Sequence, residues 1–312
     1  MAKTRAETRA VDGILLLDKP AGITSSDAVQ QVKRLYRAAK AGHAGSLDPL
    51  ATGMLPVCLG EATKLCAYLL DSDKRYTVRA RVGVRTATGD AEGAPVASSD
   101  AALLTRAALE SALPRFTGEI LQRAPMYSAR KHEGRRLYEL AREGVEVERE
   151  ARPVRVHELR LATFAAGTFD LEVSCSKGTY IRVLVEDLAA AAGQAAHVEN
   201  LRREEVSPFG AGPMLTLDDL SQRPPEARDG LLLPALRALQ GWPTVTADAP
   251  SRARLAMGQT VRLAAGQRPG QAAAVDESGR LVAVGELRAD GWFSPRRWLA
   301  GPAEKTLPAA AG

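Results

Sequence analysis

The feature that most constrains the fold is a two-residue alternation along residues 76–84. Apolar and polar side chains alternate there, with Tyr76, Val78, Ala80, Val82 and Val84 on one face and Thr77, Arg79 and Arg81 on the other. This pattern is typical of a β-strand that is buried on one side of an antiparallel sheet. Further strands are expected just before Pro20, at residues 154–164 and at residues 169–175. Helical segments separate them without a regular βαβ rhythm, so we predict a mixed α+β fold with a mainly antiparallel sheet and flanking helices.

Helical spacing marks several segments between these strands. Thr24 with Asp27 three residues later predicts a capped helix start. Further helices are expected over residues 61–70, 100–113, 137–142 and 180–192, the last ended by Gly193. From Ala41 to Gly60, glycine and proline residues interrupt any helical or strand pattern of apolar residues, which predicts a long loop. Such loops in compact domains are usually functional.

The chain length of 312 residues suits a large domain and a smaller one. Prolines cluster at residues 241–250, and short strand-like runs follow at 260–263, 272–275 and 281–287, which predicts a small β-rich module. We place the boundary near Thr246, between a large domain of residues 1–245 and a small one of residues 246–312.

Charge and cysteine content limit the function classes. The net charge of +5 and pI near 9.2 favour an anionic partner such as nucleic acid, although charge alone is weak support. The three cysteines lack C-x-x-C spacing, so we expect neither a disulfide framework nor a zinc site, and a reducing cytoplasm fits. The apolar run Ile14–Leu17 is too short for a signal peptide or a membrane span. His132, His157 and His197 show no metal-ligand spacing, so we expect no bound metal.

The segment Gly42–Gly53, with the sequence GHAGSLDPLATG, is the first candidate for chemistry. Its glycines permit close approach, and Pro49 restricts the backbone directly after Asp48. A rigid loop that presents a carboxylate suits a nucleophile or a base. An aspartate that caps a turn is the alternative, and spacing alone favours it. His43 in the same segment either stacks on a base or is simply exposed.

Two further segments carry candidate side chains. Arg182 ends the segment SKGTYIR of residues 176–182, where it either pairs bidentately with a buried carboxylate or lies on the surface. Tyr76 opens the alternating strand, and an aromatic residue there is more often part of the core than catalytic.

The stretch Arg115–Arg136 is locally basic. Six cations against two acids leave a local net charge of +4, with Tyr127 and His132 interleaved. Cations mixed with planar rings suit phosphate contacts and base stacking in folded RNA. A solvated face of mixed charge remains the alternative.

Four blocks together, LDKP at residues 17–20, GHAGSLDPLATG at 42–53, DKRY at 73–76 and SKGTYIR at 176–182, resemble the bacterial tRNA pseudouridine-55 synthase family, TruB. The resemblance covers essentially the whole chain. Residues of about 120–152 resemble the family's RNA-gripping insertion, and 196–203 resemble a later segment of its pocket. The C-terminal module resembles its PUA-like RNA-binding domain more loosely.

The resemblance implies a fold of pseudouridine synthase type and an isomerase that acts on uridine-55 in the T loop of tRNA. The base is flipped out, its glycosidic bond is cleaved, the uracil rotates, and a carbon–carbon bond forms. The reaction needs no cofactor. The implied partner is the T stem-loop of tRNA, bound by a cytoplasmic monomer, and a tRNA-folding activity is a further expectation. A non-catalytic RNA-binding protein and a glycosidic hydrolase, which usually needs paired carboxylates, are the alternatives.

The resemblance also implies a role for each site residue. Asp48 is the essential aspartate and pairs with Arg182, while Tyr76 stacks on the flipped base and helps to move the C5 proton. His43 braces the vacated stack, Tyr180 and Leu201 contact the substrate, and Lys19 and Pro20 support the pocket. The expected RNA contacts of the insertion are Arg123, Arg130, Lys131, Arg135 and Arg136. Whether Asp48 bonds to C6 or C1′, or removes the C2′ proton through a glycal-like intermediate, stays open.

Overall fold

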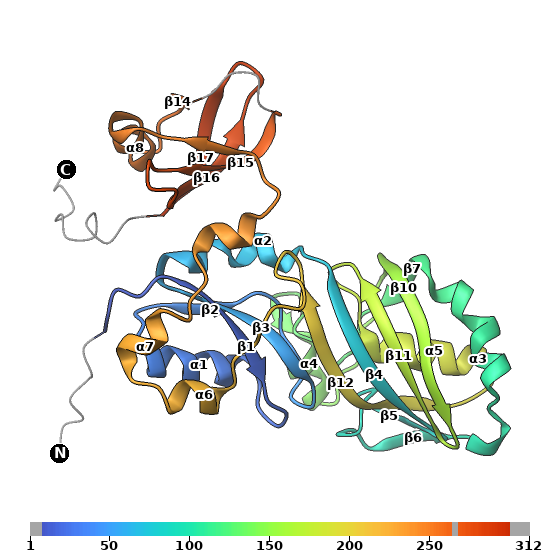
Figure 1. Ribbon diagram of the computed structural model, residues 1–312. Helices are drawn as coiled ribbons and strands as arrows, with labels where there is room; N and C mark the ends of the chain where they lie inside the picture. The colour runs from blue at the N-terminus through green and yellow to red at the C-terminus, as the bar shows by residue number, and fades with distance from the viewer. Residues whose placement is uncertain (1–7, 264–267, 300–312) are drawn as a thin grey trace.

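The computed structural model describes residues 8–263 and 268–299 and contains one large sheet. Within those residues the sheet has eight strands (Figure 1). Their order is β1 (Gly13–Lys19), β3 (Thr52–Leu59), β12 (Ala196–Val206), β4 (Lys74–Val82), β11 (Thr168–Cys175), β10 (Ala151–Ala165) and β7 (Gly118–Arg123), with β2 (Ala41–His43) paired to β3. Neighbours are antiparallel except β3 and β12, which are parallel. The predicted mixed α+β fold with a mainly antiparallel sheet is confirmed.

Two helices that pack against this sheet carry or adjoin residues of the predicted site. α1 (Ser25–Tyr36) begins with the predicted capping box, in which Thr24 Oγ1 accepts from the Asp27 amide at 3.1 Å. α5 (Ile181–Ala191) buries the apolar face that includes Leu184, Val185 and Leu188. The remaining helical segments are η1 (Gly60–Leu65), α2 (Cys66–Leu70), η2 (Ala101–Leu103), α3 (Arg106–Ala112), η3 (Leu113–Phe116), α4 (Leu137–Arg142), α6 (Leu217–Ser221), α7 (Pro225–Asp229) and η4 (Ala235–Leu239).

The single helix expected over residues 100–113 is wrong, because the segment divides into η2 and α3. Thr105 between them is extended, and its hydroxyl accepts from the Ala108 amide at 3.1 Å. A threonine that caps a helix start in this way competes with helix continuation.

The prediction of one long loop over residues 41–60 is also wrong. Its second half is β3, a buried strand between β1 and β12. Gly53 lies where β3 crosses β12 closely, and a Cβ there would be 2.2 Å from the Arg203 carbonyl oxygen. Its φ of +99° is left-handed. Glycine is therefore needed at position 53 because β3 and β12 approach closely there. The local sequence pattern cannot distinguish such a glycine from one in a loop.

The sequence-based prediction missed the central strand β12. Its pairing with β4 shifts register between Val198 and Asn200 and again between Arg203 and Glu205. Such bulges break the alternation by which a strand is recognised. Five of its eleven residues are charged, which also lowered its strand signal.

A smaller sheet follows in the chain. It consists of β13 (Thr244–Thr246), β15 (Gly270–Val275), β16 (Leu281–Leu287), β17 (Trp292–Trp298) and β14 (Val261–Arg262), with α8 (Ala249–Ala256) beside it. Figure 1 shows this sheet in orange and red, on the far side of α2 from the large sheet. Lys64 Nζ donates to the Trp298 carbonyl at 2.6 Å, and the Tyr68 and Trp242 rings meet edge to face at 5.3 Å.

The first strand of this smaller sheet ends where the predicted boundary near Thr246 was placed. The domain limits of 1–245 and 246–312 stay a prediction, and residues 300–312 lie outside the described part of the chain.

The predicted RNA-gripping insertion follows β7 and forms a small unit of its own. It contains the hairpin of β8 (Lys131–His132) and β9 (Arg135–Arg136), then α4. Ala124, Leu137 and Leu140 form its apolar cluster. A second hairpin, β5 (Val84–Thr86) with β6 (Pro95–Ser98), follows β4. None of the helices in the described residues is long and apolar enough to cross a membrane.

Candidate active site

Asp48 lies in the short connection between β2 and β3, and neighbouring elements hold that connection. Ser25 Oγ, at the start of α1, donates to the Leu47 carbonyl at 3.0 Å and accepts from the Leu47 amide at 2.7 Å. The Ala51 amide donates to the Asp48 carbonyl at 3.1 Å. These bonds fix the backbone on both sides of the carboxylate.

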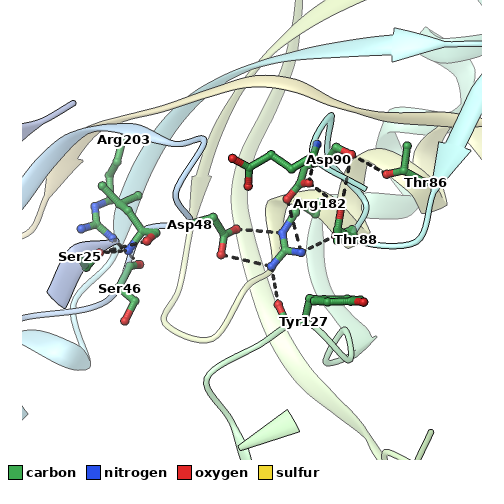
Figure 2. Close-up of polar contacts among 11 residues, drawn as sticks. Ser25, Ser46, Asp48, Thr86, Thr88, Asp90, Tyr127, Arg182 and Arg203 are labelled. Atoms are coloured by element: carbon green, nitrogen blue, oxygen red, sulfur yellow. Dashed lines mark hydrogen bonds and ion pairs between the residues drawn. The ribbon is translucent and has the colours of Figure 1, made fainter. Parts of the chain in front are cut away.

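Arg182 forms a two-point contact with Asp48 (Figure 2). Arg182 Nε lies 2.9 Å from Asp48 Oδ2, and Nη2 lies 3.3 Å from Oδ1. The guanidinium also donates to the Tyr127 carbonyl at 2.8 Å and to the Thr88 carbonyl. The Arg182 side chain is 5% exposed and that of Asp48 is 37% exposed. The arginine is therefore an anchored support, and the carboxylate is the accessible partner.

The pKa of Asp48 is raised above its ordinary value. Burial is the largest cause, the positive charge of Arg182 opposes it, and the negative charge of Asp90 adds to the rise. Asp90 Oδ2 lies 3.7 Å from Arg182 Nη1, and its Oδ1 accepts from Thr88 Oγ1 at 2.5 Å. One arginine thus faces two carboxylates, of which Asp90 is almost fully buried.

Two cavities meet at this pair. The smaller, of about 360 Å³, is lined by Tyr76, Tyr180 and Leu201, and the larger, of about 670 Å³, is lined by His43 and Arg136. Six residues line both cavities, namely Ser46, Leu47, Asp48, Ser128, Ala129 and Arg182. With Arg130, which also lines the smaller cavity, the structure therefore brings seven of the predicted residues around Asp48.

Hydrogen bonds fix the backbone of Tyr180, one of the predicted substrate-contacting residues of the smaller cavity. The Tyr180 amide donates to Gln122 Oε1 at 3.0 Å, and Gln122 Nε2 donates to the Tyr180 carbonyl at 3.3 Å. Burial raises the pKa of Tyr76, whereas nearby Arg203 opposes the rise. The Tyr76 phenol is therefore neutral at physiological pH.

His43 lies in the larger cavity and is uncharged. Burial, Arg203 and Arg136 all lower its pKa below the ordinary value of 6.5. Its Nδ1 atom is buried and has no hydrogen-bonding partner in the described part of the chain. A neutral imidazole suits stacking and hydrogen bonding.

Lys19 links the backbone at Pro20 to the loop that carries Asp48. Lys19 Nζ donates to the Pro20 and Ile23 carbonyls at 2.8 Å each and to the Pro49 carbonyl at 3.2 Å. Burial lowers the pKa of Lys19 to about 8. The side chain is fully buried, so it acts on backbone position.

The basic residues of the insertion divide into two groups. Arg130 lines the smaller cavity and Arg136 lines the larger one. Arg123, Lys131 and Arg135 are exposed and line neither cavity, and Arg135 pairs with Glu143. Contact with RNA stays a prediction for all five residues.

Charged residues of the site that were missed from the sequence include Asp90, Lys74 and Arg203. Asp90 contacts Arg182, whereas Lys74 and Arg203 line the smaller cavity. Lys74 stands within the DKRY block and Arg203 ends the segment 196–203 that resembles part of the family's pocket, and these resemblances were the available signals, whereas Asp90 had none. Within residues 8–263 and 268–299, no group of three histidine, cysteine, aspartate or glutamate side chains could hold a metal ion.

Comparison with known proteins covers nearly the whole chain. The family model "TruB family pseudouridylate synthase (N terminal domain)" matches residues 33–181, and "tRNA pseudouridylate synthase B C-terminal domain" matches residues 182–240. The tRNA pseudouridine synthase B of Sodalis glossinidius (strain morsitans) is 48% identical over 97% of this chain and 99% of its own length. That of Pseudomonas aeruginosa (strain UCBPP-PA14) is 47% identical over 96% of this chain and 99% of its own length.

Solved structures show the same architecture. An archaeal box H/ACA Nop10–Cbf5 complex has a chain of TM-score 0.70 and 25% identity, over 92% of this chain and 86% of that one. A Cbf5–Nop10–Gar1 complex has a chain of TM-score 0.71 and 25% identity, over 94% of this chain and 86% of that one. The likeness confirms the predicted fold, and the small C-terminal sheet fits a PUA-like domain.

Proposed function

The chain belongs to the TruB family of pseudouridylate synthases, and we propose that it isomerises uridine-55 in the T loop of tRNA with Asp48 as the catalytic carboxylate. It is an isomerase whose substrate is RNA. The observation that supports the assignment of Asp48 is the two-point Arg182 contact at the junction of two cavities. A carboxylate held in this way is oriented and still accessible.

The two cavities suit the two parts of a flipped nucleotide. The larger one is open to the basic insertion and suits the RNA strand, with His43 beside the vacated stack. The smaller one is lined by rings and an apolar side chain, and it suits the extruded uracil against Tyr76, Tyr180 and Leu201. The ribose then lies at their junction, next to Asp48.

The reaction follows from that placement. Asp48 acts on the sugar or the ring while the bond between C1′ and N1 breaks, the uracil rotates within the smaller cavity, and C5 bonds to C1′. Tyr76 stacks on the uracil and helps to move the C5 proton. Because the product is an isomer of the substrate, the reaction requires no co-substrate that donates a chemical group or electrons.

Release of tritium from C5-labelled uridine in a tRNA transcript tests the role of Asp48. We expect release from the wild-type protein and none from Asp48→Asn, since the amide is neutral and cannot act as nucleophile or base. Unchanged release from Asp48→Asn would remove Asp48 from the mechanism. Free uracil as a product would instead indicate a glycosidic hydrolase.

We also propose that the protein acts as a monomer on the T stem-loop, in the cytoplasm. The free state of Cys58, Cys66 and Cys175 supports a reducing compartment. Carbodiimide mapping of pseudouridine in cellular tRNA, with and without the protein, tests the substrate. Loss of signal at one T-loop position supports the proposal, whereas loss at other positions would reassign the site. A tRNA-folding activity stays a prediction, and Asp48→Asn would separate it from isomerisation.

A further inference from the structure

Two buried cations in the smaller cavity have no part in the chemistry described above. Lys74 is 8% exposed and Arg203 is 1% exposed, and both line the cavity together with Tyr76. Neither forms an ion pair with a carboxylate among residues 8–263 and 268–299. The acids close to Lys74 in sequence have other direct partners, since Asp71 pairs with Lys177 at 2.8 Å and Asp73 lies 3.2 Å from His157.

The hydrogen bonds of these cations go to neutral carbonyl groups. Lys74 Nζ donates to the Leu70 carbonyl at 3.0 Å and to the Ser72 carbonyl. Arg203 donates from Nε to Met54 at 2.7 Å, from Nη2 to Gly45 at 3.1 Å and from Nη1 to Ser46 at 3.4 Å. An ammonium has three N–H groups and a guanidinium five, so each keeps at least one donor. In the described residues, therefore, no direct ion pair balances either positive charge, and Asp71 and Asp73 act on Lys74 only as nearby charges that raise its pKa against the larger effect of burial.

Both cations lie close to Tyr76. Arg203 stands directly opposite Tyr76 in the ladder of β12 and β4, and such partners have Cβ atoms about 4.5–5.5 Å apart. Lys74 precedes Tyr76 by two residues and shares its face of β4. A Cβ on Gly45 would be 3.7 Å from Arg203 Nη1 and 3.8 Å from Lys74 Cε, so both charges approach the same point. If uracil stacks on Tyr76, as proposed above, the cations lie beside the base.

Negative charge develops on uracil in every route open to Asp48. When the bond from C1′ to N1 breaks, its electron pair stays on N1, and the uracil becomes an anion. If Asp48 first adds to C6, the charge appears on C5 and O4 of the same ring. After C5 bonds to C1′, the C5 proton leaves and N1 gains a proton, which balances the isomerisation. Prepositioned positive charge stabilises such an anion in a cavity that excludes water.

We propose that Lys74 and Arg203 stabilise the uracil anion of the reaction and are catalytic residues at the base, separate from the Asp48–Arg182 pair at the sugar. This inference rests on the proposed function. It differs from a phosphate-binding role, in which the same cations would hold the RNA strand rather than the departing base.

Substitutions at Lys74 separate charge from packing. Lys74→Gln removes the charge and keeps a donor for the Leu70 carbonyl, whereas Lys74→Arg keeps the charge. Arg75→Met is the matched control, because Arg75 is the next residue of β4 and its side chain is 44% exposed on the opposite face. We expect Lys74→Gln to lower the single-turnover rate about a hundredfold, with the Kd for a T stem-loop transcript unchanged. We expect Lys74→Arg and Arg75→Met to stay within about tenfold of wild type.

A second substrate tests the leaving group itself. Fluorine at C5 withdraws electrons and stabilises the uracil anion, so 5-fluorouridine at the target position needs less help from the protein. We expect the Lys74→Gln defect in its single-turnover consumption to be smaller than with uridine, whereas a disturbed fold would reduce both rates equally. Equal defects on the two substrates would overturn the proposal.

The remaining outcomes are also decisive. A raised Kd with a shallower salt dependence and an unchanged single-turnover rate would assign the cations to phosphate and overturn the proposal. Thermal unfolding checks that each variant folds. If Lys74→Gln does not fold, the single-turnover rate of Arg203→Lys is measured instead. A retained rate supports the role of the charge, and a lost rate contradicts it. Absence of pseudouridine with the wild-type protein would instead contradict the proposed function.

Discussion

The site contains two buried arginines whose partners differ. Arg182 on α5 faces the carboxylates of Asp48 and Asp90 (Figure 2). The bonds of Arg203 on β12 go instead to the carbonyl groups of Gly45, Ser46 and Met54. A buried cation that pairs with an acid fixes that acid and has its charge balanced. A buried cation bonded to carbonyls keeps its charge, which is then available to a substrate. The comparison suggests that one side of the site orients the reacting group and the other receives negative charge.

Removing the paired arginine should have the largest effect of the substitutions that follow. We expect Arg182→Met to lower the single-turnover rate about a thousandfold, because Asp48 loses its orientation and its compensating charge. Arg182 lowers the pKa of Asp48, so its loss should raise that pKa and move the acid limb of the pH–rate profile to higher pH. Arg182→Lys keeps the charge without the two-point contact and should recover part of the rate. An acid limb that stays in place would contradict the pairing.

The strand β3, which follows the Asp48 loop, approaches β12, which carries Arg203, most closely at Gly53. Because a Cβ at Gly53 would lie 2.2 Å from the Arg203 carbonyl oxygen, we expect Gly53→Ala to destabilise the fold by about 3 kcal/mol. Urea unfolding measures this change. Gly178→Ala is the matched control, because Gly178 also has positive φ but a Cβ there would meet nothing within 4 Å. Equal losses from both variants would show that φ strain, not the crossing, limits position 53.

Substitution of Ser25 should disturb the loop that carries Asp48 without weakening RNA binding. The Ser25 hydroxyl both donates to and accepts from Leu47, so Ser25→Ala leaves a buried amide and a buried carbonyl without that partner. We expect a loss of about 1–2 kcal/mol in unfolding free energy and a lower rate, with the RNA Kd unchanged. Ser111→Ala, on an exposed face of α3, controls for the loss of a serine hydroxyl. A lower rate without any loss of stability would point to direct substrate contact instead.

The smallest expected change is in the pH dependence of stability, to which the buried lysines Lys19 and Lys74 contribute. Burial lowers the pKa of both Lys19 and Lys74 from 10.5 to about 8. Between those values the unfolded chain binds more protons than the folded one, so stability should rise with pH across this window. We expect a rise of about 1 kcal/mol per lysine, reduced from the full shift by solvent screening. Lys19→Met should flatten the rise in urea unfolding at pH 8–10, and an unchanged slope would contradict the assignment.

Local patterns predicted the elements that local physics controls. The capping residues Thr24 and Asp27 marked the start of α1, and alternation marked β4. The strand β12 was missed because its bulges and charges make sense only beside β3 and β4. Likewise, Gly53 resembled a loop glycine until its neighbour across the sheet was known.

The same division holds for the site. Asp48, Tyr76 and Arg182 stand in blocks that resemble a known family, so the sequence identified them together with the type of reaction. Spacing alone favoured a turn residue at Asp48. Asp90 had no such signal, and Arg203 was not singled out within the segment 196–203. Only the structure brings Asp90 to the Asp48–Arg182 pair and Arg203 to the smaller cavity.

By itself, the sequence determined the fold class, the family and the residue types available for chemistry, because periodicity and motifs depend on neighbours along the chain. Only the tertiary structure decided that Arg182 meets Asp48 across 134 residues and that Arg203 stands opposite Tyr76. These contacts depend on strand order and register, which are set by packing between distant segments. For the same reason, the difference between a paired and an unpaired buried arginine cannot be seen in the sequence.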